Sequence, residues 1–251
     1  KTSDDNVIED VKFTAKGTDG NTYEDYTDEN GKILWTDLPV IHTDGTDITY
    51  SIYENDVELR YEDMQPKTTT ITRNTTTTVA FHNTQKTGII KLGKTSEDNI
   101  VEGHTFVVVA TNNEQKEYTG VTNEAGEILW EKLPVYNISN EKIEYLLYED
   151  GTAIRYVEPV EQLVTITENQ TTTVNFVNNL KRTQLQLIKR AEGESVEGFE
   201  FVIKSDSPLH EYTDTQVTNA EGKLTFENLV IYDSEGNNIA YTIYEDNVPV
   251  A

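Results

Sequence analysis

The sequence repeats itself at a spacing of about 95 residues, and this repeat constrains the fold more than any other feature. Three segments open with a lysine and close with a phenylalanine: KTSDDNVIEDVKF, KTSEDNIVEGHTF and KRAEGESVEGFEF. Later landmarks keep the same spacing, since Trp35 and Trp130 are 95 positions apart and so are Glu54 and Glu149. A unit of this length can bury a core of its own, so the sequence predicts tandem domains rather than a solenoid.

We place the domain boundaries near Lys86 and Lys181, which gives domains at residues 1–86, 87–181 and 182–251. The connections are short and contain neither proline nor a Gly-Ser run, which predicts stiff joints. The first domain begins at its lysine, without the apolar lead-in that IIKLGK and LQLIKR supply in the other two. The third reaches Ala251 without a final strand. We therefore expect a piece of a longer protein whose targeting signals lie elsewhere.

Within each repeat the hydrophobic pattern has a period of two. Ile48, Tyr50 and Ile52 alternate with more polar residues, and turn signals such as Ala125-Gly126 separate runs of this kind. No window shows a helical stripe, so the fold class predicted is an all-β sandwich. The stretches TTTITRNTTTTVAF and VTITENQTTTVNF also match O-glycosylated sequence. Their alternation favours strands, and we predict hairpins that turn at Arg73-Asn74 and Glu168-Asn169.

Composition excludes several classes of function. The chain carries 45 acidic against 20 basic residues, a formal net charge of −25, so a nucleic-acid partner is not expected. A protein this acidic should be soluble and monomeric. It has no cysteine, which excludes disulfides and thiolate metal sites, and no apolar run long enough to span a membrane.

No metal, cofactor or turnover enzyme is predicted. The acidic pairs Asp4-Asp5 and Glu62-Asp63 fail the EF-hand pattern, and a solvated acidic surface accounts for them. Motifs for phosphate binding, dinucleotide binding or a nucleophile elbow are missing from the sequence. The histidines lie on different segments without metal-ligand spacing: His42, His82, His104 and His210.

A lysine, a glutamate and an asparagine recur where the strand pattern asks for apolar residues. Each continues an apolar row at the end of a strand, so alternation points it inward. Asn178, rather than its neighbour Asn179, continues the row of Val174 and Phe176. The lysines are Lys1, Lys94 and Lys189, the glutamates are Glu54, Glu149 and Glu245, and the asparagines are Asn83 and Asn178.

Two interpretations account for these polar residues. The strand ends could emerge from the core, with the lysines and glutamates reaching into water. Alternatively, the lysine and asparagine form an intramolecular isopeptide bond. A buried lysine loses its charge and becomes nucleophilic, and a glutamic acid kept protonated by the same surroundings polarises the asparagine amide as ammonia leaves. Three coincident rows per repeat favour the second interpretation.

The combined motifs resemble the Cna B-type (SpaA-like) domains of Gram-positive surface adhesins and pilins. The stretches DLPVIHTDGTDITYSIYEND and KLPVYNISNEKIEYLLYEDG carry the resemblance most strongly, and it covers nearly the whole chain. It implies prealbumin-like (Ig-like) β-sandwiches in a bead-string array. It also implies the bonds Lys1–Asn83 and Lys94–Asn178, formed with the help of Glu54 and Glu149, whereas Lys189 beside Glu245 has no acceptor in this chain.

The function expected from this resemblance is structural. The repeats would form a stalk that is anchored to the cell wall outside this fragment and holds an adhesive domain away from the cell. Partners on the host surface or matrix would then be bound by other domains of the full protein. A pilin subunit polymerised by sortase and repeats that themselves bind a matrix ligand are the alternatives.

Overall fold

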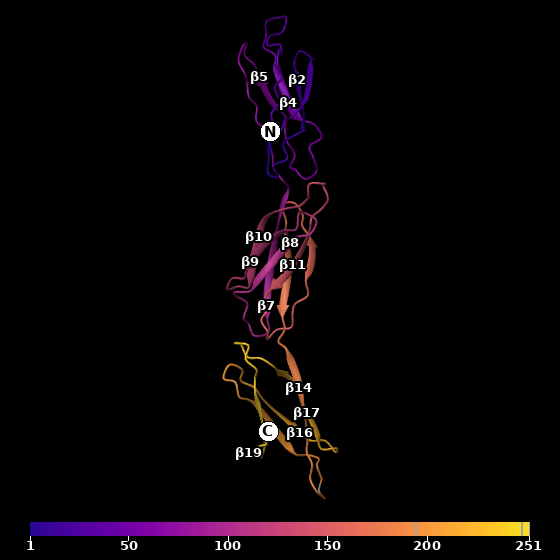
Figure 1. Cartoon of the computed structure of the whole chain (residues 1–251), viewed down its shortest axis with the longest axis vertical. Coiled ribbons are helices and arrows are strands. Elements are labelled where there is room, and N and C mark those ends of the chain that lie inside the picture. The colour runs from indigo at the N-terminus through magenta and orange to yellow at the C-terminus, as the bar shows by residue number, and fades with distance from the viewer. Residues whose placement is uncertain (194, 247, 251) are drawn as a thin grey trace.

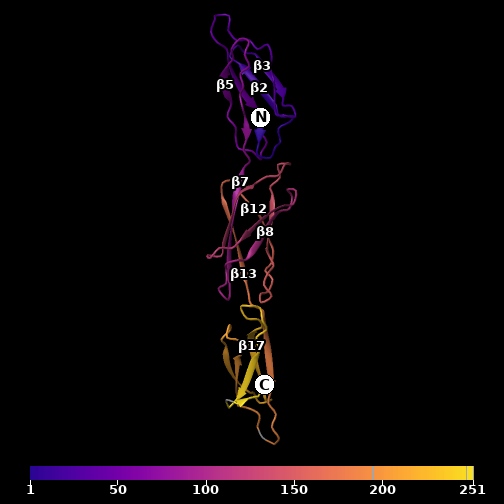
Figure 2. The same cartoon turned by 60° about the vertical axis from the view of Figure 1, so that its left-hand side comes forward.

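The computed structural model describes residues 1–193, 195–246 and 248–250, and every regular element in this part of the chain is a β-strand. The strands form three successive sets along an elongated molecule (Figures 1 and 2). The first set runs from β1 to β6, the second from β7 to β13 and the third from β14 to β19. The predicted all-β tandem architecture is confirmed. Within the described residues, no helix has the length and apolar character needed to cross a membrane.

The second set is a complete two-sheet sandwich. In one sheet the long strand β7 (Thr87–Ser96) lies between β10 (Glu127–Pro134), which is antiparallel to it, and β13 (Thr171–Asn178), which is parallel. The other sheet is antiparallel and has the order β12-β11-β8-β9. Its strands are β8 (Thr105–Ala110), β9 (Lys116–Val121), β11 (Glu144–Asp150) and β12 (Gln162–Thr165).

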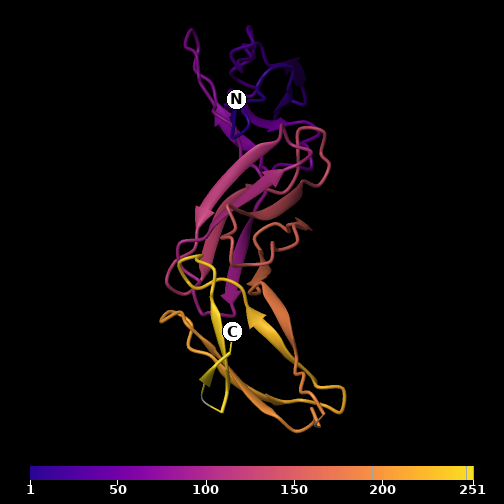
Figure 3. The same cartoon turned by 60° about the horizontal axis from the view of Figure 1, so that its bottom comes forward.

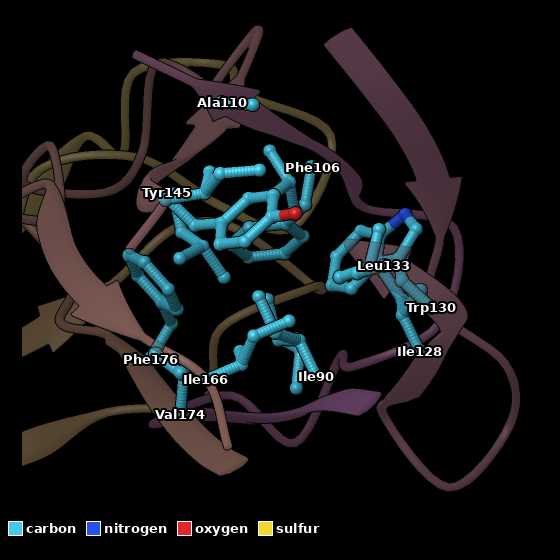
Figure 4. Packing of buried hydrophobic residues seen from close by; sticks show 14 of the residues in the cluster. Ile90, Phe106, Ala110, Ile128, Trp130, Leu133, Tyr145, Ile166, Val174 and Phe176 are labelled. Carbon is cyan, nitrogen blue, oxygen red and sulfur yellow. The ribbon is translucent and has the colours of Figure 1, made fainter. Parts of the chain in front are cut away.

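The core of the second set lies between its two sheets (Figure 4). Alternate residues of β7 and β13 face alternate residues of β8 and β11, as the period of two requires. Ile90, Leu92 and Leu147 are fully buried, and the rings of Phe106 and Phe176 lie 5.0 Å apart across the sheets. Burial of each such side chain contributes about 1.5–3 kcal/mol, so this packing is what holds the sheets together.

The predicted hairpins are wrong, although the predicted turns are present. Asn74 and Asn169 have positive φ angles of 57° and 55°, which mark tight turns at these positions. However, β12 pairs with β11 while β13 pairs with β7, so the chain crosses from one sheet to the other at Asn169. An alternating pattern identifies a strand but does not say which partner the strand takes.

The first set has the same antiparallel sheet and a reduced second sheet. The antiparallel sheet has the order β3 (Thr22–Tyr26), β2 (Lys12–Gly17), β4 (Thr49–Glu54), β5 (Lys67–Thr70). The second sheet consists of β1 (Thr2–Ser3) and β6 (His82–Asn83), which pair in parallel over two residues. Segments 32–41 and 71–81 therefore flank a groove of mixed polar and apolar character. Trp35 is only half-buried there, whereas Trp130 is 7% exposed in the second set.

The third set pairs β14 (Arg182–Ile188) with β17 (Lys223–Val230) opposite the sheet β16-β15-β18-β19. The strands of that sheet are β15 (Glu200–Ser205), β16 (Thr213–Val217), β18 (Tyr241–Glu245) and β19 (Val248–Pro249). Phe226 is fully buried at the position of the two tryptophans, so the exchange keeps a large core side chain. Figure 3 brings this set forward. Ala251, the predicted end of the third domain, lies outside the described residues.

The two joints between the sets use the same backbone hydrogen bonds. The Lys86 amide donates to the Arg60 carbonyl at 2.8 Å, and the Lys86 carbonyl accepts from the Val135 amide at 2.9 Å. At the second joint Lys181 donates to Arg155 at 2.8 Å and accepts from Ile231 at 3.0 Å. Each linker residue is therefore tied to both of the sets that it connects.

We expect Gly126→Ala to destabilise the second set more than Gly151→Ala does. Both glycines have positive φ angles, 73° and 70°, so each alanine costs roughly 1–3 kcal/mol of backbone strain. A Cβ at Gly126 would also meet the Lys94 carbonyl oxygen at 2.5 Å, which adds about 1–3 kcal/mol of overpacking. Nothing lies within 4 Å of a Cβ at Gly151.

Urea unfolding followed by tryptophan fluorescence measures this difference. A Trp35→Phe background leaves Trp130 as the reporter, because the chain has two tryptophans. Equal losses of stability in the two alanine variants would contradict the expectation.

Candidate functional site

The sandwich brings the predicted lysine, glutamate and asparagine together at one end of its core. Lys94 lies near the end of β7 and Asn178 ends the neighbouring parallel strand β13, opposite Ser96. Glu149 lies near the end of β11 in the facing sheet, paired with Phe106. The lysine and the asparagine therefore come from one sheet and the glutamate from the other, and all three point into the space between them.

The first set places its three residues in the same register. Asn83 pairs with Ser3, two residues after Lys1, and Glu54 pairs with Phe13. The α-amino group of Lys1 donates to the Gly31 carbonyl at 2.8 Å, as the backbone amide of Lys94 does to Gly126 at 2.7 Å. The short strand β1 therefore holds its lysine where the long strand β7 holds the corresponding one.

At the second site the three side chains are sealed from solvent. The Lys94 Nζ lies 3.9 Å from the Glu149 Oε2, and the Asn178 Nδ2 donates to the Glu149 Oε1 at 3.0 Å. The side chains of Lys94 and Glu149 are 0% and 1% exposed, and Asn178 is 0% exposed. Lys94 Nζ also donates to the Thr95 carbonyl at 3.1 Å and lies 5.7 Å from the centre of the Tyr156 ring.

The first site has the same arrangement with a closer lysine. The Lys1 Nζ lies 3.2 Å from the Glu54 Oε2, and the Asn83 Nδ2 donates to the Glu54 Oε1 at 2.8 Å. The Lys1 and Glu54 side chains are 1% and 4% exposed. The Lys1 amine is aligned too poorly with Oε2 for a hydrogen bond, so Coulomb attraction dominates this contact. Because these side chains are buried, the lysines of the two sites do not reach into water.

Both sites contain buried polar atoms without a hydrogen-bond partner. At both sites these atoms are the asparagine amide oxygen and the glutamate Oε2, and at the first site the Lys1 Nζ is a third. Each such atom costs about 1–3 kcal/mol, so the arrangement is expensive as a resting state. Turning the amide by 180° brings its oxygen to the carboxyl, and a protonated carboxyl would then donate to it.

Burial also acts on the lysines. Removal from water lowers the pKa of Lys1 and of Lys94 below the ordinary lysine value, and the attraction of Glu54 or Glu149 only partly opposes this effect. The amines therefore lose their charge more readily than an exposed lysine does. Amines of this kind are nucleophiles.

The third site pairs a lysine with a glutamate and is more open. The Lys189 Nζ donates to the Glu245 Oε1 at 2.5 Å, and the two side chains are 23% and 22% exposed. The Lys189 Nζ lies 4.9 Å from the centre of the Phe199 ring. Among the described residues, no asparagine bonds to Glu245.

A second polar cluster beside each sealed site was missed by the sequence reasoning. In the second set the Tyr156 hydroxyl bonds to both carboxylate oxygens of Asp98, and the Arg155 Nε donates to Asp98 at 3.0 Å. Asp5, Arg60 and Tyr61 repeat the cluster in the first set. The sequence held a signal, since an aspartate follows each of the first two lysines by four positions and the Arg-Tyr pairs recur 95 residues apart.

This cluster supports the tyrosine ring that the lysine amine approaches. Burial opposes the ionisation of Asp98, but hydrogen bonds from Ser96, Tyr156, the Ile100 amide and Arg155 outweigh it and hold its pKa below the ordinary value. The same balance lowers the pKa of Asp5. The predicted surface role for Asp5 is therefore wrong, because its carboxylate binds Arg60 and Tyr61 within the fold.

One further side chain reaches a sealed site. The His104 Nδ1 lies 2.7 Å from the Glu149 Oε1. His104 is two residues before Phe106, which pairs with Glu149, so strand alternation would have placed it on the same face. The histidines lack metal-ligand spacing, and a contact between His104 and a carboxyl was not predicted. No cluster of three or more potential metal ligands occurs in the described part of the chain.

Comparison with known proteins identifies one family. The model of the Cna protein B-type domain matches residues 5–86 and 202–250, just over half of the chain. No curated protein sequence matches the chain.

Solved structures match the chain at low sequence identity. The Bacillus anthracis TIE protein is 17% identical with a TM-score of 0.65, and the match covers 97% of this chain and 44% of that one. This chain therefore spans less than half the length of that structure. Two B repeat units of the collagen binding protein of Staphylococcus aureus are 17% identical, with a TM-score of 0.34 and coverages of 97% and 66%. The shaft pilin SpaA of Lactobacillus rhamnosus GG is 16% identical, with a TM-score of 0.33 and coverages of 65% and 89%.

We expect Tyr156→Phe to destabilise the second set by about 1.5–3 kcal/mol at neutral pH, because it removes a hydrogen bond to a charged carboxylate. The folded-state pKa of Asp98 is depressed, so this stabilisation is present above the unfolded value of about 3.9 and is lost as pH falls through the folded value. The difference between wild type and variant should therefore shrink below about pH 4.

Chemical unfolding between acidic and neutral pH measures this difference. Tyr148→Phe is the matched control. Tyr148 lies on the face of β11 opposite to that of Glu149, and its hydroxyl makes no hydrogen bond within the described residues. A difference that stays constant with pH would contradict the role assigned to Asp98.

Proposed function

Because the chain belongs to the Cna B-type domain family, we propose that it is part of the stalk of a Gram-positive cell-surface adhesin, stiffened by isopeptide bonds. Its domains are residues 1–86, 87–181 and 182–251. The observation that carries the proposal is the sealed set of lysine, glutamate and asparagine in each of the first two domains. The stalk projects from the cell wall, and other parts of the full protein contact the host surface or matrix.

The bond-forming reaction uses groups that the fold already holds together. The neutral amine of Lys94 attacks the Cγ of Asn178, a C–N bond forms, the Cγ–Nδ2 bond breaks and ammonia leaves. Glu149, in its acid form, donates a proton to the amide as the tetrahedral intermediate forms. It then passes the proton released by Nζ to the departing nitrogen and takes its own proton back from the oxygen as the carbonyl re-forms, so the glutamate ends as it began. Folding supplies the proximity, and each site reacts once.

The contacts at both sites support this chemistry. The asparagine Nδ2 that must leave already bonds to the glutamate carboxyl, at 2.8 Å in the first site and 3.0 Å in the second. Burial lowers the pKa of both lysines, which favours the neutral amine. The reaction also removes an ionisable amine from the interior, so the product is better suited to burial than the reactants.

The bonds lie where they carry load. Lys94 is on the strand that enters the second domain and Asn178 is on the strand that leaves it, so tension along the stalk passes through the cross-link. By analogy with disulfides, closing a loop of about 80 residues contributes roughly 4–5 kcal/mol. A sortase-polymerised pilin and a matrix-binding repeat would use the same domains. No specific contact in the described residues favours either over a stalk.

We expect the intact mass of the folded chain to be lower than its sequence mass by about 34 Da, which is one ammonia of ~17 Da for each of two bonds. Mass spectrometry measures the shift, and peptide mapping assigns it to Lys1–Asn83 and Lys94–Asn178. Lys189→Ala is the control and should leave the shift unchanged. An unshifted mass in the wild type would refute the proposal.

We expect Glu54→Ala and Glu149→Ala each to remove one mass shift of ~17 Da, because each domain depends on its own proton carrier. Circular dichroism should show that both variants keep their β-structure. If the bond still forms in Glu149→Ala at the wild-type rate, the glutamate is not the group that assists the reaction.

A further inference from the structure

His104 gives the second site a partner that the first site lacks. Its side chain is 9% exposed and its Nδ1 lies 2.7 Å from the Glu149 Oε1. The corresponding residues are Val11 in the first repeat and Phe199 in the third, by position in the repeated motif. The backbone is the same at all three positions, because each amide donates to a threonine hydroxyl at 2.9–3.0 Å. Only the side chain differs.

The hydrogen bonds of His104 fix the number of protons that it shares with Glu149. Its Nε2 lies 3.2 Å from the Ile100 carbonyl oxygen, which can only accept, so Nε2 carries a hydrogen. The contact between Nδ1 and Oε1 then needs one proton between them. If the proton is on the carboxyl, both groups are neutral, and if it is on the imidazole, the charges are opposite. In either case the pair has no net charge.

A neutral pair changes the surroundings of Lys94. At the first site the Lys1 Nζ lies 3.2 Å from the Glu54 Oε2 and no histidine contacts Glu54, so whenever Glu54 is ionised its charge favours a charged amine. At the second site the distance from Lys94 Nζ to Glu149 Oε2 is 3.9 Å, and the Lys94 amine donates to the Thr95 carbonyl instead. His104 thus competes with Lys94 for the charge of Glu149.

We infer that His104 is a positioning residue for the Lys94–Asn178 bond: by holding a proton against Glu149, it leaves the amine of Lys94 neutral and able to attack at lower pH. This inference rests on the proposed function. The second domain would then complete its bond under more acidic conditions than it could with an apolar residue at this position.

Other charged groups around the site do not replace this effect. Asp98 faces the site from the loop after β7, but its carboxylate is paired with Arg155 and bonded to Tyr156. The Tyr156 ring lies 6.0 Å from the His104 ring and 5.7 Å from the Lys94 amine. The first site also contains the α-amino group of Lys1, which has no counterpart beside Lys94. The effect of His104 is therefore measured by comparing variants of the second site with one another.

The test measures bond formation as a function of pH. Unbonded chain, recovered unfolded and checked by intact mass, is refolded at a series of pH values and quenched, and each cross-linked peptide is quantified by mass spectrometry. In His104→Val the pH of half-maximal rate for Lys94–Asn178 should rise by about 1–3 units, the effect expected of a charge within ~4–6 Å. Val11→His should lower the corresponding pH for Lys1–Asn83.

Two controls separate the charge of His104 from its shape. Valine is native at this position in the first repeat, so His104→Val is compatible with the fold. His104→Gln keeps a hydrogen-bond donor to Glu149 but cannot take up a proton, so it should behave like His104→Val.

Three outcomes would count against the inference. An unchanged midpoint in His104→Val, with both bonds forming, overturns it and leaves the proposed function standing. A wild-type midpoint in His104→Gln also overturns it, because a hydrogen bond would then suffice. If neither bond forms at any pH, the proposed function fails and the inference fails with it.

Discussion

A lysine amine sealed inside a β-sandwich is the constraint on which the rest of the structure depends. An isolated buried charge is too costly to keep, so the amine must be neutral, paired or consumed by reaction. The fold places the lysine and the asparagine, its proposed acceptor, on adjacent parallel strands, β7 and β13. It brings Glu149, the proposed proton carrier, from the facing sheet through β11. Each sheet alone would supply only part of the set, so the sandwich itself assembles the site.

Much of this arrangement could be predicted from the sequence because strands have a simple period. Alternation along Val174 and Phe176 was enough to select Asn178, which is fully buried, over Asn179, which is exposed. The repeat gave three copies of the same pattern, so Glu54 and Glu149 could be matched without knowledge of the fold. The all-β tandem architecture followed from the same two features.

The features that sequence reasoning missed depend on which strands become neighbours. The threonine-rich stretches looked like hairpins, yet their strands join different sheets, because pairing is decided by the packing of the whole domain. The cluster of Asp98, Arg155 and Tyr156 joins segments that are far apart in the chain. No role was predicted for His104, because its spacing from the other histidines fits no metal site and its contact is with a carboxyl.

The buried arginine at the first joint has a consequence for how the chain can be divided. Arg60 bonds to Asp5 and Tyr61 on one side, and its other atoms reach the Ile138 carbonyl and the Asn140 side chain at 3.1 and 3.2 Å. A guanidinium that is 2% exposed in the whole chain would face water if the second domain were cut away. The repeats are therefore not freely interchangeable modules, because residues of one repeat complete the burial of a side chain in the repeat before it.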